Sequence, residues 1–72
     1  MKLSDLKIGE KRKVLRLDLD SEMTRRLLDL GFTVGTEIEA VQSSPSGDPV
    51  AYRVRGTIFA VRKKEAENIE LE

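Results

Sequence analysis

The fold is decided by residues 23–61, which read MTRRLLDLGFTVGTEIEAV and then QSSPSGDPVAYRVRGTIFAV. A short amphipathic segment ends at Gly31, and a second glycine, Gly35, opens a segment in which apolar and polar residues alternate. A loop rich in proline, serine and glycine follows, and two further alternating segments are joined across Arg55 and Gly56. This order is typical of a small closed β-barrel that carries one inserted helix.

A helix is predicted from Asp20 or Ser21 to Leu30. The residues at its start supply hydrogen-bond acceptors and negative charge, which suit the first N–H groups because these have no partner within the helix. Met23, Leu27 and Leu30 recur at i, i+4 and i+7, so this stripe is expected to face the core.

Two glycines are predicted to mark chain reversals. Gly31 follows the last helical residue, where a positive φ is common, and Phe32 is placed to pack back on Leu27 in a Schellman ending. Gly56 lies between two strands and permits the positive φ that a tight hairpin requires.

Alternation of apolar and polar residues predicts five strands, over residues 11–17, 35–43, 50–55, 57–62 and 68–72. Ile38 and Ala40 are expected to face the core. In the first strand, either Leu15 and Leu17 point inward, or Val14 does so beside a bulge. Helical turns are expected over residues 3–9 and 63–67, and Leu3, Leu6 and Ile8 should fold onto the barrel.

Residues 1–72 are therefore predicted to form one mainly β domain. We expect a small SH3-like, five-stranded barrel with one short α-helix after the first strand and helical turns near both ends. A closed barrel removes most of the exposed strand edges that invite aggregation.

Composition limits the function. The 72 residues contain 13 Lys and Arg, 13 Asp and Glu, and neither histidine nor cysteine. A neutral total argues against a protein that coats nucleic acid, because that affinity comes largely from neutralised phosphates. The sequence shows neither a signal peptide nor an apolar run of bilayer length, so a cytoplasmic protein is expected.

No pattern for catalysis or metal binding emerges from the chain. It lacks a P-loop, an imidazole base and a thiol nucleophile, so we expect it not to be an enzyme and to hold no cofactor. Glu37 and Glu39 could jointly touch a cation, but alternating glutamates on a strand are usually a solvated face. The glutamates at positions 65, 67, 70 and 72 are interpreted in the same way, and no metal site is predicted.

Five motifs follow one another along almost the whole chain: Leu3-x-x-Leu6-x-x-Gly9; Arg26-Leu27-x-x-Leu30-Gly31 with Gly35-Thr36; Ser44-Pro45-Ser46-Gly47-Asp48-Pro49-Val50; Val54-Arg55-Gly56; and Ala60-Val61-Arg62-Lys63-x-x-Ala66-x-x-Ile69. Together they resemble the FeoA family, small cytosolic proteins associated with bacterial ferrous iron uptake. The family pattern often has proline before the glycine that opens the second strand, where this chain has Val34.

The resemblance implies an accessory protein that binds the cytosolic part of FeoB, the GTPase and permease that moves Fe²⁺, and that supports or modulates its assembly or activity. Any membrane association would come through that partner, and weak self-association stays open. The resemblance extends to the SH3-like domain of metal-dependent repressors. A stand-alone regulatory module acting on such a repressor is therefore one alternative, and a weak nucleic-acid-binding barrel is another.

The loop after the second strand is the first predicted partner-binding segment. Its two prolines limit the conformational entropy lost on docking, although it could equally be a plain hairpin connection. The candidate residues are Ser44, Pro45, Ser46, Asp48 and Pro49.

The exposed face of the helix is the second predicted segment, with Arg25, Arg26 and Asp29 as candidates. The arginines are expected to pair with Glu22 and Asp29 along the helix rather than to act as an arginine finger on a GTPase. The cations of the third and fourth strands and the turn after them, at positions 53, 55, 62, 63 and 64, could form a patch for an acidic protein surface or could serve solubility alone.

Overall fold

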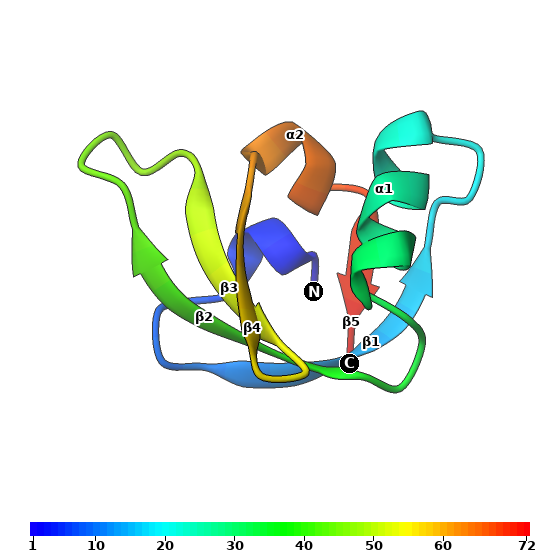
Figure 1. Cartoon of the computed structure of the whole chain (residues 1–72), viewed down its shortest axis with the longest axis horizontal. Helices are drawn as coiled ribbons and strands as arrows, with labels where there is room; N and C mark the ends of the chain where they lie inside the picture. The colour runs from blue at the N-terminus through cyan, green and yellow to red at the C-terminus, as the bar shows by residue number, and fades with distance from the viewer.

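A single antiparallel sheet, with its strands in the order β4-β3-β2-β1-β5, makes up most of the computed structural model (Figure 1). All 72 residues are described. The elements follow the chain as η1 (Leu3–Asp5), β1 (Lys11–Leu17), α1 (Glu22–Leu30), β2 (Glu37–Ser43), β3 (Val50–Val54), β4 (Thr57–Val61), α2 (Lys63–Ala66) and β5 (Ile69–Leu71). This confirms the predicted mainly β architecture, with one helix after the first strand and helical turns near both ends.

Strand β1 belongs to both halves of the barrel. Its first part pairs with β2 and its second part with β5. The register with β5 shifts between Val14 and Arg16, so Val14 is buried while Leu15 is 45% exposed. Of the two arrangements that the sequence left open, inward Val14 beside a bulge is the one that the structure adopts.

The sheet has two free edges, because β4 and β5 form no ladder with each other. Helix α2 carries the chain from the end of β4 to the start of β5 (Figure 1). The ring of hydrogen bonds expected from the sequence is therefore open at this one place.

The core lies between the bent sheet and the helices. Ile38 and Ala40 on β2 are fully buried, as their alternation with glutamates predicts. The rings of Phe32 and Phe59 lie 6.4 Å apart at a tilted angle. The buried apolar residues are Leu3, Leu6, Val14, Leu27, Phe32, Ile38, Ala40, Tyr52, Val54, Val61, Ala66, Ile69 and Leu71.

The end of α1 confirms the predicted Schellman motif. Gly31 has φ 113°. The Gly31 N–H donates to the Leu28 carbonyl at 3.1 Å, and the Phe32 N–H donates to the Leu27 carbonyl at 3.0 Å. A Cβ at Gly31 would lie 3.3 Å from Cγ1 of Val54, so glycine also allows the close approach of α1 to β3.

Two apolar residues that the sequence placed in the core lie at the surface. Met23 is 45% exposed and Ile8 is 53% exposed. Leu27 is buried and Leu30 packs against the core, as predicted, but Thr24 takes the inward position expected for Met23. Ile8 lies in the turn before Gly9, beyond the segment in which Leu3 and Leu6 pack inward.

The Thr24 hydroxyl is fully buried and has no hydrogen-bond partner. Since valine has a similar helix propensity and no polar group to leave unsatisfied, Thr24→Val should raise the free energy of unfolding by about 1 kcal/mol. Thr33→Val is the control, because the Thr33 hydroxyl is bonded to that of Thr36 at 2.7 Å, and it should lower stability. Urea denaturation measures both, and a destabilised Thr24 variant would contradict the expectation.

Tyr52 is the single tyrosine of the chain, and its side chain is buried under η1. Its hydroxyl donates to the Leu3 carbonyl at 3.3 Å. Burial raises the pKa of Tyr52 to about 12, and the Asp48 carboxylate adds to the shift.

The raised pKa of Tyr52 links stability to alkaline pH. In the unfolded chain the phenol ionises near its ordinary pKa of about 10, so the contribution to stability is complete below that pH and is lost as pH rises toward 12. Phenolate absorbance reports Tyr52 alone, since the chain has no tryptophan. The midpoint should fall to the ordinary value in denaturant and, more modestly, in native Asp48→Asn. Equal midpoints for native and denatured protein would refute the assignment.

Candidate functional site

Three segments gather at one end of the barrel: α1, α2 and the loop of residues 44–49. Helix α2 lies between the other two (Figure 1). Its polar contacts reach Arg26 on one side and Asp48 on the other. We call this surface the helical end.

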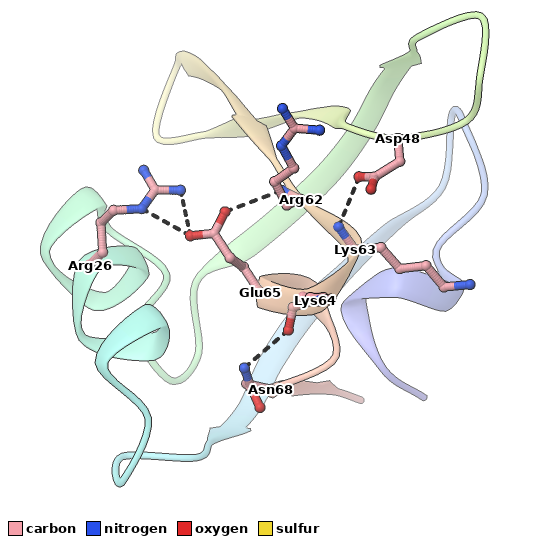
Figure 2. Close-up of polar contacts among 7 residues, drawn as sticks. All are labelled: Arg26, Asp48, Arg62, Lys63, Lys64, Glu65 and Asn68. Carbon is pink, nitrogen blue, oxygen red and sulfur yellow. Dashed lines mark hydrogen bonds and ion pairs between the residues drawn. The ribbon is translucent and has the colours of Figure 1, made fainter.

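Glu65 of α2 makes the contact with α1. The side chain is only 11% exposed, and its Oε2 accepts from Nε of Arg26 at 2.9 Å and from Nη2 at 2.6 Å. Its Oε1 accepts from the backbone N–H of Arg62 at 3.2 Å, which satisfies one donor at the start of α2 (Figure 2). A charge-assisted pair of this kind fixes both the position and the orientation of the arginine.

Two expectations about charged residues were therefore wrong. Glu65 is not a solvated glutamate, and Arg26 pairs with it rather than with Glu22 or Asp29. The reason is tertiary: Ala66 and Ile69 are fully buried, and their burial draws α2 down beside α1. The local pattern of the helix could not show this contact.

Asp48 makes the contact between the loop and α2. Its Oδ1 accepts from the backbone N–H of Lys63 at 2.9 Å (Figure 2). The loop is also bonded within itself: the Ser44 N–H donates to the Pro49 carbonyl at 3.1 Å, and the Ser46 hydroxyl donates to the Asp48 carbonyl at 3.0 Å. The loop therefore presents a fixed shape with an exposed tip around Pro45.

The structure brings together part of the predicted partner-binding set. Arg26 and Asp48 are joined through α2, which the prediction left out. Arg25 and Asp29 are exposed on α1 and form no ion pair. Glu65 could have been found from the spacing Arg62-x-x-Glu65, because a glutamate three residues after a helix start typically bonds back to the N-cap N–H.

A cleft of about 490 Å³ opens at the helical end, lined by Met23, Asp48, Arg62, Lys64 and Glu65. Both carboxylates already accept backbone or guanidinium hydrogen bonds. The side chains of Arg62 and Lys64 form no ion pair. The cleft therefore offers two unpaired cations beside an exposed thioether.

The cations on β3 and after β4, which the sequence suggested as a possible patch, do not lie together. Arg53 bonds Glu39 on the neighbouring strand at 2.7 Å, so these two residues form a cross-strand pair. The register of β3 with β4 puts Arg53 near the hairpin and Arg62 beyond the opposite end, so the third and fourth strands do not form one basic patch. No group of three or more His, Cys, Asp or Glu residues is placed to hold a metal ion.

None of the helices has the length and apolar character needed to cross a bilayer.

Comparison with known proteins gives a consistent result. A family model described as the FeoA domain matches residues 1–72. The chain is 35% identical over its full length to a Porphyromonas gingivalis protein described as an Fe(2+) transport protein A/Fe(2+) transporter FeoB fusion, of which it spans 8%.

Solved structures show the same relationship. Iron(II) transport protein A from Clostridium thermocellum is 40% identical, with a TM-score of 0.92 over the whole of this chain and 44% of that one. Stenotrophomonas maltophilia FeoA, described as an SH3 domain protein complexed with zinc, is 32% identical, with a TM-score of 0.89 over the whole of this chain and 89% of its own.

A manganese-dependent transcriptional repressor has a TM-score of 0.83 at 13% identity, which shows the shared fold alone. The matched family model covers every residue, and the Porphyromonas gingivalis and Clostridium thermocellum relatives are described as Fe(2+) and iron(II) transport proteins. The SH3-like barrel predicted from the sequence is confirmed, and the chain belongs to the FeoA domain family.

Proposed function

We propose that this protein is a non-enzymatic accessory protein of ferrous iron uptake that binds the cytosolic part of an FeoB-type transporter. The fusion protein of Porphyromonas gingivalis is the observation that supports it, because there a domain like this one is covalently joined to FeoB. A covalent link raises the effective concentration of two parts that act together. The same interaction between separate chains must come from surface contacts.

The helical end is the surface that suits this role best. Its loop and α1 supply the residues named above for partner binding: Arg25, Arg26, Asp29, Ser44, Pro45, Ser46, Asp48 and Pro49. The hydrogen bonds through α2 hold the two segments in place, so little entropy is lost when a partner docks. The protein would act in the cytoplasm and reach the inner face of the membrane through its partner.

The chain's contribution to transport would be contact rather than chemistry. It contains no P-loop, so any nucleotide hydrolysis in the complex belongs to the transporter's GTPase domain. Docking would support assembly of the transporter or modulate its activity.

Titration of this chain into the cytosolic region of the FeoB-type transporter from the same organism tests the proposal. Saturable binding is expected in calorimetry. Arg25→Glu should weaken binding about fivefold, as the loss of about 1 kcal/mol implies, while Lys13→Glu on β1 should not change it. Absence of binding to a folded, nucleotide-competent transporter region would count decisively against the proposal.

The helical end should also depend on Glu65 for its shape. Glu65→Ala loses the contacts with Arg26 and the bond to the Arg62 N–H, so it should cost about 2 kcal/mol of unfolding free energy. Glu65→Gln keeps an acceptor for the Arg62 N–H and should cost about 1 kcal/mol less.

Chemical denaturation measures these differences, and Glu67→Ala is the control because Glu67 is exposed and forms no ion pair. Transporter binding should weaken in both Glu65 variants. Equal stability of the Glu65→Ala and Glu67→Ala variants would show that the contact does not hold the helical end together.

A further inference from the structure

The cleft at the helical end is lined by two cations that have no ion-pair partner, while one of its two carboxylates, that of Glu65, is paired with Arg26. The two cations are Arg62 and Lys64; both are exposed, and neither takes part in any of the four ion pairs of the structure. Lys63, between them, is exposed and unpaired as well. Arg62 and Lys64 are therefore the two cations without an ion pair that line this cleft, whereas Lys63 lines a separate pocket beside Tyr52.

The two carboxylates of the cleft form no ion pair with Arg62 or Lys64. Asp48 accepts from the Lys63 backbone N–H, and Glu65 accepts from Arg26 and from the Arg62 backbone N–H. Both carboxylates are thus directed at α1 and at the backbone of α2 (Figure 2). The other acidic residues of these segments, Glu22 and Asp29 on α1 and Glu67 directly after α2, are exposed and form no ion pair with the two cations.

Met23 gives the cleft an apolar wall. It is 45% exposed at the first turn of α1, where the helix has turned it away from the core. A volume of about 490 Å³ lies within the range of pockets that enclose small ligands, about 300–1,000 Å³. It can therefore accept one large apolar side chain together with its charged neighbours.

We propose that this cleft binds an acidic segment of a partner protein, in which one apolar side chain packs against Met23 and the flanking carboxylates pair with Arg62 and Lys64. Methionine suits such a contact because its flexible thioether adapts to different apolar shapes. The inference rests on the proposed function in that the segment is expected in the cytosolic region of the transporter. It adds the chemistry of that segment.

Two pairs of matched variants test the cleft against the same transporter region. The double variant Arg62→Gln/Lys64→Gln should bind at least tenfold more weakly, whereas Lys7→Gln/Lys13→Gln has the same net charge, alters exposed unpaired lysines elsewhere and should bind like the original chain. Met23→Ala should also weaken binding. Leu15→Ala is its control, since Leu15 is exposed to the same extent, 45%, outside the cleft.

The dependence of binding affinity on salt concentration gives an independent measure of how much the charges contribute to binding. Affinity of the original chain should fall as ionic strength rises, and the fall should be much smaller for Arg62→Gln/Lys64→Gln. Far-UV circular dichroism and melting temperature show that each variant is folded. If the transporter region binds the original chain and all four variants equally, the cleft is not the site, while the proposed function stands.

A peptide titration tests the cleft independently of the transporter. It is needed if the transporter does not bind at all, a result that would refute the proposed function. The probe is an acetylated and amidated peptide of five residues, with a central leucine flanked by glutamates. Its addition should shift the amide signals of Met23, Arg62 and Lys64 in NMR spectra. These shifts should be absent in Arg62→Gln/Lys64→Gln and with a peptide that has glycine in place of leucine. No shift at those residues would overturn the inference.

Discussion

A single carboxylate, that of Glu65, joins the parts of the molecule that the sheet leaves separate. Because β4 and β5 do not pair, the segment between them has no ladder bonds to either strand, and side-chain contacts help to hold it. Glu65 does this by binding the Arg26 guanidinium through one oxygen and, through the other, the N–H of Arg62 directly before α2. The cost of removing the Glu65 carboxylate from water is offset by these charge-assisted bonds. Such bonds contribute more at a buried carboxylate than in a pair that is fully exposed to water.

The surface that follows from this contact is assembled from segments far apart in the chain. The loop before β3, the helix after β1 and the turn before β5 each reach the same end of the barrel (Figure 1). Asp48 and Glu65 hold α2 from opposite sides through bonds to the backbone N–H groups of Lys63 and Arg62. The cations beside them are left without partners, and the charge character of the cleft is a by-product of how the helical end is built.

Much of the fold could be predicted because its causes are local. The alternation at Ile38 and Ala40 fixes one face of β2, and Gly31 ends α1 because only glycine adopts its φ without strain. Val14 and Leu15 were ambiguous, since a bulge depends on the strand opposite, which the pattern of β1 alone does not reveal. The prediction for Met23 was wrong because a residue at the edge of the apolar stripe of a helix can face either the core or the solvent.

The candidate site was predictable only in part, for a physical reason. The loop and the exposed face of α1 have local signals in their prolines and charges. Glu65, by contrast, pairs with Arg26, which lies far away in the sequence, and nothing in the residues around either one indicates the other. Its bond to the Arg62 N–H had a local signal, the spacing of a capping box, which indicates a helix start but not a partner on α1.

The division of β1 between two neighbours also bears on how fast the protein folds. The pairing of its first half with β2 joins segments separated by one helix, but Val14 in its second half must find Leu71, almost the whole chain away. Contacts of such sequence separation slow the search for the native state, because loop closure must precede any gain from the new bonds. The late arrival of β5 would leave half of β1 exposed as an unprotected edge, and it is during this interval that the chain is most open to misassembly.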